Sequence, residues 1–230
     1  MFTSQDIRIA VDAVVFGYKE KQLYIVLIKQ KFGVYRDRWS LPGGFVLNGE
    51  GLKDAIIREL QEETGITTSY LEQLYTFGDD VNRDERAQVV SVAYFGLVNP
   101  SKLDLSASTD AQDVAWFPVN EIPELPFDHN EIINKAIQRL KGKLNYEPIG
   151  FDLLDEKFPF PSLEQLYQTI LDKEIDRRNF RKKMLSFGIL NETDEKVSIG
   201  GGRPAKLYTF NKEKYEELLK EKFVFDIKFV

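Results

Sequence analysis

The sequence predicts an α/β (α+β) protein with two domains, a larger mixed domain followed by a small winged helix-turn-helix. A helix with one apolar stripe, Leu52–Thr64, lies between runs of β-branched and apolar residues that are typical of strands. A segment with two prolines then separates this part from the rest of the chain. Beyond that segment come two short helical patterns and two strand patterns around a glycine-rich tip.

Paired strands are expected at the start of the chain. Ile7–Phe16 and Leu23–Ile28 are rich in β-branched and apolar residues, and a short polar turn separates them. The long apolar run of Ala87–Val98 predicts a strand with a central position in the sheet. The remaining elements expected in the larger domain are the strand Leu71–Phe77 and the helix Asn130–Lys141, and the segment Asp110–Phe117 leads to Pro118 before that helix.

The helix Leu52–Thr64 carries a stripe that turns from apolar to acidic along its length. The stripe consists of Leu52, Ala55, Ile56, Glu59, Glu62 and Glu63. We therefore expect its three carboxylates to point inward and Thr64 to point outward. Carboxylates at i, i+3 and i+4 repel one another, so a partly buried trio needs cations nearby. Arg58 supplies one, and oxygen ligands alone indicate a hard divalent metal, Mg²⁺ or Mn²⁺, as the other.

These residues resemble a complete Nudix box. Gly44, Glu50 and the run Arg58–Ile66 fill every fixed position, and Trp39–Gly44 resembles the segment that precedes the box in that family. The resemblance implies a Nudix α/β/α sandwich. It also implies hydrolysis of a nucleoside diphosphate that is linked to another group.

The resemblance also assigns roles within the box. Glu59, Glu62 and Glu63 would be catalytic and would bind the metal, with the carbonyl oxygen of Gly44 as a further ligand. Arg58 would orient the carboxylates. A metal that bridges a diphosphate neutralises developing charge and lowers the pKa of an attacking water, which agrees with this assignment. Whether the box still catalyses hydrolysis or serves recognition alone stays open.

Candidate contacts to an effector or substrate lie in two loops. Arg36 and Arg38 belong to a basic loop that precedes the box, where arginines can meet a phosphate or remain solvated. Arg83 belongs to an acidic loop that resembles the substrate-facing loop of ADP-ribose-handling Nudix proteins. For Arg86 in the same loop, a solvated role is favoured. His129 is the sole histidine and is interpreted as structural.

Composition excludes several classes of protein. The 230 residues contain 43% hydrophobic residues, enough for a packed core in one large domain or two small ones. The absence of cysteine excludes disulfides and thiolate metal sites. No segment approaches the roughly 18 apolar residues of a membrane span, and the first residues lack a signal-peptide pattern. A cytoplasmic protein without a membrane partner is therefore expected.

Three segments are expected: a Nudix domain over residues 1–142, a linker over 143–161 and a winged helix-turn-helix over 162–230. The linker contains Pro148, Gly150 and Pro159. The net charge of −6 disfavours a nucleic-acid partner for the chain as a whole, yet residues 161–230 carry +2 and residues 1–160 carry −8.

The last segment contains two expected helices. A capping box of Ser162 and Gln165 would begin the first helix. The second would begin at Asp176 and place Phe180 and Met184 on one face. A polar turn over Asn191–Lys196 and two strands around a Gly-Gly-Gly-Arg-Pro-Ala tip would follow and form a β-wing.

A basic helix and a wing can contact double-stranded DNA, the helix in the major groove and the wing at phosphates or the minor groove. The candidate DNA-binding residues are Arg178, Arg181, Lys182, Arg203 and Lys206. One winged helix covers too little base edge for genomic specificity, so a homodimer on a two-fold operator is expected.

The whole chain resembles the Nudix-related (NrtR-like) transcriptional regulators. The resemblance rests on Asp176–Lys183, Gly202–Tyr208 and the linker residues Glu147–Leu154. It implies a DNA-binding regulator whose Nudix domain senses a metabolite, either ADP-ribose or a related NAD-pathway nucleotide, or a sugar. Many members have a decayed box, whereas this box is complete. An active Mg²⁺-dependent ADP-ribose pyrophosphatase therefore remains the alternative.

Overall fold

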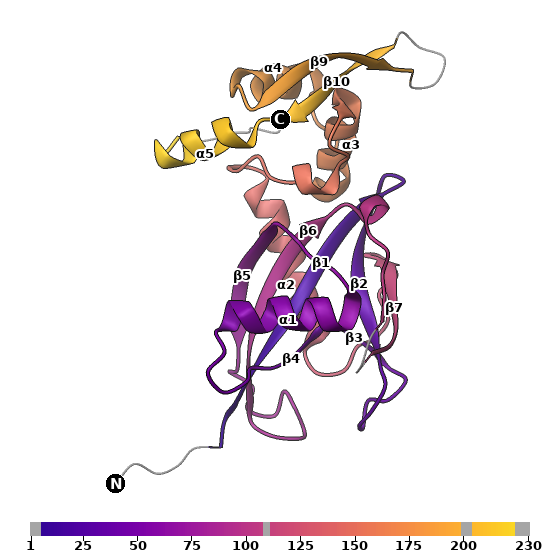
Figure 1. Cartoon of the computed structure of the whole chain (residues 1–230), viewed down its shortest axis with the longest axis vertical. Coiled ribbons are helices and arrows are strands. Elements are labelled where there is room, and N and C mark those ends of the chain that lie inside the picture. The colour runs from indigo at the N-terminus through magenta and orange to yellow at the C-terminus, as the bar shows by residue number, and fades with distance from the viewer. Residues whose placement is uncertain (1–5, 108–110, 199–203, 224–230) are drawn as a thin grey trace. The chain divides into compact units, whose positions relative to one another are not determined.

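The computed structural model describes residues 6–107, 111–198 and 204–223. These residues form two compact units (Figure 1). The first unit comprises the chain up to Lys19 and Leu23–Ile137, and the second comprises Glu20–Gln22 and the chain from Gln138 onward. The three segment boundaries expected from the sequence stay a prediction.

The first unit is built on a mixed seven-stranded sheet. Its strands are β1 (Arg8–Lys19), β2 (Gln22–Gln30), β3 (Trp39–Ser40), β4 (Gly43–Phe45), β5 (Tyr70–Phe77), β6 (Val89–Val98) and β7 (Ala111–Pro118). The order is β3-β2-β1-β6-β5, with β4 paired to β1 and β7 paired to β2. Strands β1 and β6 run parallel, whereas β5 is antiparallel to β6 and β7 is antiparallel to β2. The expected interior position of the long apolar strand is confirmed, since β6 lies between β1 and β5.

Helix α1 (Leu52–Thr64) lies in front of the sheet, and helix α2 (His129–Lys143), whose residues up to Ile137 belong to this unit, lies behind it (Figure 1). A short 3₁₀ turn, η1 (Pro100–Lys102), follows β6. Apolar side chains of α1, among them Ile56 and Leu60, pack with those of β1, among them Val11 and Val15. The predicted sandwich is therefore confirmed.

Helix α1 has the predicted bounds, but the stripe that it buries differs from the prediction. It ends at Gly65, whose φ of 72° is the left-handed conformation that glycine adopts without a Cβ clash. Leu60 and Thr64 are buried, whereas Glu62 is exposed. The predicted outward Thr64 and inward Glu62 are thus wrong. The buried arc is centred on Ile56, Leu60 and Glu63, which leaves Glu62 at the solvent edge.

The second unit has the elements of a winged helix. They are η2 (Phe151–Leu153), β8 (Phe158–Pro159), α3 (Phe160–Leu171), α4 (Arg177–Ser186), β9 (Leu190–Val197), β10 (Ala205–Phe210) and α5 (Lys212–Lys220). Its small sheet has the order β8-β10-β9. Aromatic rings from α3 and α4 meet in the core, where Tyr167 and Phe180 lie 4.9 Å apart. Asp176 caps α4 by accepting hydrogen bonds from the backbone N–H groups of Arg178 and Asn179, as the predicted start requires.

Two local predictions for the second unit are wrong. Helix α3 begins at Phe160 with Pro159 as its N-cap, so Ser162 does not form the expected capping box. Asn191–Lys196 was expected as a turn but lies within β9. Most of its side chains are exposed, so this edge strand is held by pairing with β10 and lacks an apolar pattern. The predicted wing tip spans residues 200–205; residues 200–203 lie outside the described residues, and Ala205 begins β10.

Candidate functional site

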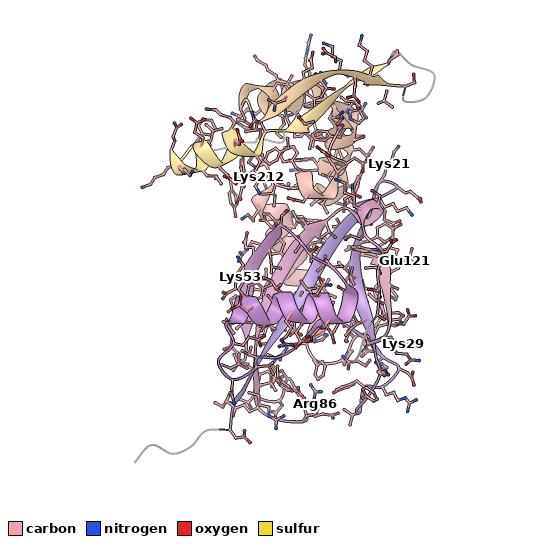
Figure 2. All side chains as sticks on the ribbon, viewed as in Figure 1. Lys21, Lys29, Lys53, Arg86, Glu121 and Lys212 are labelled. Atoms are coloured by element: carbon pink, nitrogen blue, oxygen red, sulfur yellow. The ribbon has the colours of Figure 1, made fainter. Side chains whose placement is uncertain are left out.

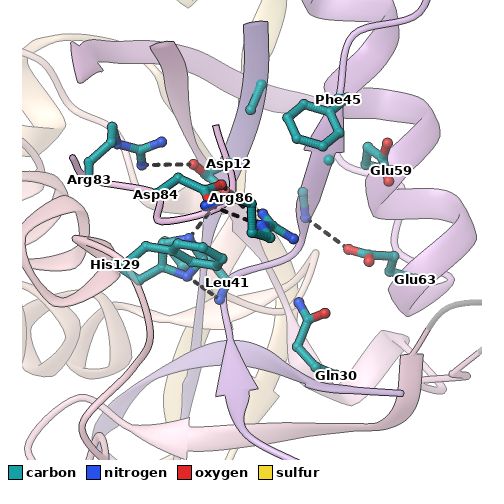
Figure 3. Close-up of a pocket in the computed structure, with 14 residues that line it drawn as sticks. Asp12, Gln30, Leu41, Phe45, Glu59, Glu63, Arg83, Asp84, Arg86 and His129 are labelled. Carbon is teal, nitrogen blue, oxygen red and sulfur yellow. Dashed lines mark hydrogen bonds and ion pairs between the residues drawn. The ribbon is translucent and has the colours of Figure 1, made fainter. Parts of the chain in front are cut away.

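A pocket of about 270 Å³ lies in the first unit (Figure 3). Strands β1 and β4 and helix α1 supply part of its wall, and the segments 83–86 and 127–129 supply another part. Its ionisable lining residues are Asp12, Glu59, Glu63, Arg83, Asp84, Arg86 and His129. Because this lining holds both signs of charge, the pocket suits a polar, charged ligand.

Arg58 holds the carboxylates of the box together. Its Nε donates to Glu50 Oε1 at 2.7 Å, and its Nη1 donates to Glu59 Oε1 at 2.7 Å and to Glu62 Oε2 at 3.3 Å. Its Nη2 also donates to the carbonyl oxygen of Phe45 at 3.3 Å. The hydrogen bond from Arg58 lowers the pKa of Glu50 to about 2. This geometry supports the predicted orienting role of Arg58.

Glu59 and Glu63 are the two box carboxylates that line the pocket. A Cβ on Gly44 would lie only 2.4 Å from Glu59 Oε1, so only glycine leaves room for the carboxylate here. The backbone N–H of Gly43 donates to Glu63 Oε2 at 2.8 Å and fixes that side chain. Burial raises the pKa of Glu59, which means that its charged form lacks sufficient compensation.

The donor chemistry of this corner fits a hard divalent cation. Glu59 and Glu63 contribute carboxylate oxygens beside the backbone of Gly44, and oxygen donors are what Mg²⁺ and Mn²⁺ prefer. Among the described residues, however, no three His, Cys, Asp or Glu side chains converge as a metal-binding group. Arg58 occupies the position between Glu59 and Glu62. A metal here would therefore rely on Glu59 and Glu63.

Arg83 reaches the pocket, but other groups already hold its guanidinium. Its Nε donates to Asp128 Oδ2 at 2.8 Å, its Nη2 also donates to Asp128, and Asp12 Oδ2 lies 3.8 Å away. The Arg83 side chain is only 4% exposed. Its first role is to neutralise two carboxylates in the pocket wall, and a ligand phosphate would have to share it.

His129 begins helix α2 and links two parts of the pocket wall. Its Nδ1 accepts a hydrogen bond from the backbone N–H of Leu41 at 3.0 Å, and its Nε2 lies 3.5 Å from Asp12 Oδ1. Burial opposes ionisation of Asp12, but His129, Ser91 and Arg83 together outweigh it and hold the pKa of Asp12 below its usual range. These contacts support the structural interpretation of His129. The residue also lines the pocket.

Arg86 forms part of the pocket wall, although the sequence favoured a solvated role for it. Its Nε donates to Asp84 Oδ1 at 2.9 Å and its Nη2 donates to Asp84 Oδ2 at 2.8 Å. Its guanidinium carbon lies 4.9 Å from the ring centroid of Phe127, a cation-π distance. Phe127 has a φ of 58°, a conformation unusual for a bulky residue, and its ring also contacts Tyr35 at 4.6 Å.

Four residues predicted as catalytic or effector-binding do not line the pocket: Arg58, Glu62, Arg36 and Arg38. Glu62 has a side chain that is 52% exposed, the Arg36 side chain is 72% exposed, and Arg38 is exposed. Sequence reasoning missed Asp12, Asp84 and Phe127. Asp12 could have been noticed, because an acid inside the apolar strand Ile7–Phe16 breaks its pattern and buried charges are paired.

The four predicted DNA-binding residues that the structure describes fall into three groups. Arg178 and Lys182 are exposed on α4. Arg181 is half-buried, since its Nη2 donates to Tyr208 Oη at 2.9 Å. Lys206 lies on β10 and forms an ion pair with Glu192. Arg203 lies outside the described residues.

The Arg58–Glu50 pair predicts an acid-dependent loss of stability. The pKa of Glu50 is depressed in the folded state, so the pair stabilises the protein above the ordinary value of 4.5 and this stabilisation is lost as pH falls towards 2. Glu50→Gln should therefore lower the urea midpoint above pH 5, and the difference from wild type should shrink as pH approaches 2. Glu121→Gln, at an exposed position (Figure 2), is the control with the same charge change. A difference that does not vary with pH would contradict the role of the pair.

Both domains of the chain match models of known protein families. The model of the NUDIX domain matches residues 6–140, and the model of the NrtR DNA-binding winged helix domain matches residues 150–210. The ADPR responsive transcriptional repressor NtrR of Acinetobacter baylyi is 33% identical over 210 residues, which cover 90% of this chain and 83% of that protein. The chain belongs to the NrtR family of Nudix-related transcriptional regulators. The predicted family is thus confirmed.

Solved structures support both domains of this NrtR-family chain. NrtR of Shewanella oneidensis in complex with a 27mer DNA matches with a TM-score of 0.78 and 31% identity, over 90% of this chain and 95% of that one. The NUDIX domain of the same protein in complex with ADP ribose matches with a TM-score of 0.54 and 34% identity, over 60% and 90% of the two chains. Nudix hydrolases generally use divalent metals. No helix in the described ranges is long and apolar enough to cross a membrane.

Proposed function

We propose that this protein is a transcriptional regulator that binds operator DNA through its winged helix and senses ADP-ribose, or a closely related nucleotide, in its Nudix pocket. One observation carries the proposal: the same chain contains a charged Nudix pocket and a winged-helix domain. Helix α4 of that domain exposes Arg178 and Lys182. Relatives of the same architecture respond to ADP-ribose and bind DNA. We propose the cytoplasm as its compartment, where operator and nucleotide are both accessible.

A nucleotide diphosphate suits the pocket better than a neutral sugar does. Arg83 and Arg86 lie on one side, and a divalent cation held by Glu59 and Glu63 would add positive charge on the other. Phosphate oxygens can use both features, whereas a pentose offers only hydroxyl groups. The rings of Phe45 and Phe127 also give the pocket aromatic surface.

The protein would act as a homodimer on DNA. A single α4 reads few base pairs, and two copies related by a two-fold axis read two half-sites about 10–10.5 bp apart. An effector then changes DNA affinity only if it binds the DNA-competent and DNA-incompetent states with different affinities. The pocket is thus the sensing site and the winged helix is the output.

Hydrolysis is the second candidate function, and the arrangement of Glu59 and Glu63 favours it. Both carboxylates line the pocket beside the backbone of Gly43 and Gly44. With Mg²⁺ or Mn²⁺ bound, the site would gain the charge needed to stabilise a diphosphate under attack by water. Glu59 and Glu63 would hold the ion, and Arg58 would keep Glu59 oriented.

One experiment separates the two functions. Full-length protein is incubated with DNA from the region upstream of its own operon, ADP-ribose and Mg²⁺, and both DNA binding and AMP release are measured over time. If the protein is a regulator, it binds the DNA, and ADP-ribose changes the fraction of DNA that is bound, whereas arabinose does not. For an active hydrolase, Glu59→Gln should reduce AMP release by about 10²-fold or more without unfolding the protein. Wild type that forms no salt-sensitive DNA complex, with or without ADP-ribose, would refute the regulator.

A further inference from the structure

A network of polar contacts joins helix α4 to the wing of the second unit. Arg181 Nη2 donates to Tyr208 Oη at 2.9 Å, and Tyr208 Oη donates to Glu192 Oε2 at 3.1 Å. Lys206 Nζ donates to the other carboxylate oxygen of Glu192. The carboxylate of Glu192 on β9 is therefore linked to two cations. It contacts Lys206 on β10 directly and Arg181 on α4 through the hydroxyl group of Tyr208.

The two cations of the network have different freedom to move. Arg181 lies over the ring of Phe160, 4.4 Å from its centroid, and hydrogen bonds to the buried Tyr208. Lys206 and Glu192 have side chains that are 50% and 47% exposed. Water competes with such an exposed pair, so another anion can replace the carboxylate readily. Arg181 is therefore a positioning group, whereas Lys206 can change its partner.

Strand register places a second cation beside Lys206. Glu192 lies directly opposite Tyr208 in the β9–β10 ladder, and Lys196 lies directly opposite Lys206. Like charges in directly opposed positions are destabilising, so this part of the wing attracts an anion. In the free protein the carboxylate of Glu192 meets that need, and its hydrogen bond holds the pKa of Lys206 above the usual range.

We propose that Glu192 is an internal competitor for DNA phosphate. Its carboxylate binds the ammonium group of Lys206 in the free protein and has to release it when the wing meets the DNA backbone. This proposal rests on the proposed DNA-binding function and adds to it a residue that weakens binding. Because DNA binding has to break this ion pair, part of the favourable free energy of a contact between Lys206 and phosphate is offset.

The test is Glu192→Gln in the full-length protein, measured by fluorescence anisotropy with a labelled operator duplex and with an unrelated duplex of the same length. Glutamine keeps an acceptor for Tyr208 and removes only the charge, so circular dichroism and the thermal midpoint should not change. We expect both duplexes to bind about threefold to tenfold more tightly at 50 mM salt. We also expect this tightening to shrink as the salt concentration rises, because salt screens interactions between exposed charges.

Two controls make the result specific to the ion pair. Glu121→Gln makes the same charge change on the surface of the first unit (Figure 2) and should leave DNA binding unchanged. In a Lys206→Ala background, Glu192→Gln should have no further effect, because the cation for which carboxylate and phosphate compete is gone.

The alternative outcomes separate a failure of this proposal from a failure of the proposed DNA-binding function. Unchanged or weaker DNA binding by the Glu192→Gln variant would make Glu192 a purely structural part of the wing and refute the proposal. Equal tightening in the Lys206→Ala background would assign the effect to general charge and refute it as well. Wild type that binds neither duplex would instead refute the proposed DNA-binding function, so the two failures are distinguishable.

Discussion

Replacing Arg83 with methionine is expected to lower the free energy of unfolding by about 3–5 kcal/mol, because it leaves the carboxylates of Asp128 and Asp12 without their buried cation. The Arg83 side chain is 4% exposed, so water cannot take over its role. Urea denaturation followed by tryptophan fluorescence measures this change. Both tryptophans, Trp39 and Trp116, lie in the first unit, so the signal reports on the unit that contains Arg83.

The matched control is Arg36→Met. Arg36 also lies next to an aspartate, Asp37, at 3.6 Å, but its side chain is 72% exposed. Surface substitutions of this kind change stability by about 0.5 kcal/mol or less. If Arg83→Met were as stable as Arg36→Met, the guanidinium of Arg83 would be available to a ligand, and its predicted role in effector binding would be its main role.

The double substitution Arg178→Ala and Lys182→Ala is expected to weaken binding to the operator duplex by about 30-fold or more. Each cation at a base edge or phosphate contributes about 1–3 kcal/mol, and both side chains are exposed on α4. Fluorescence anisotropy at fixed salt measures the loss. The thermal midpoint should not fall, because neither side chain belongs to the core.

Lys212→Ala provides the control for this experiment. Lys212 is an exposed lysine of the same unit at the start of α5 (Figure 2), and its removal should change affinity by less than about threefold. A double variant that loses no more affinity than Lys212→Ala would mean that α4 is not the helix that contacts DNA.

Much of the fold could be predicted because its local signals agree with its packing. Leu52–Thr64 has the bounds of α1, since the apolar stripe and Gly65 both mark them. The strand β9 could not be predicted, because Asn191–Lys196 has a polar composition and only its hydrogen-bonding partner makes it a strand. The error over Glu62 has a similar origin. A helical projection shows which side chains share a face of α1, but packing against the sheet determines which face is buried.

Only part of the candidate site could be predicted from the sequence. The box residues are contiguous, so their spacing identified Glu59, Glu63 and Arg58 as a cluster. Asp12 and Asp128 are far apart in the chain and meet at Arg83 only in the fold. No local pattern in the sequence records such contacts between distant residues, so the sequence shows Arg83 as a loop cation and does not show its buried partners.

Phe127, in the pocket wall, has a strained left-handed backbone conformation. A bulky residue at a φ of 58° is less stable by about 1–3 kcal/mol than in an ordinary conformation, and contacts with Tyr35 and Arg86 offset this. A ligand that draws Arg86 away from the ring removes one of those contacts. The costly backbone conformation of Phe127 is thus held in place by side chains of the pocket region, and one of them is a cation that a ligand phosphate can contact.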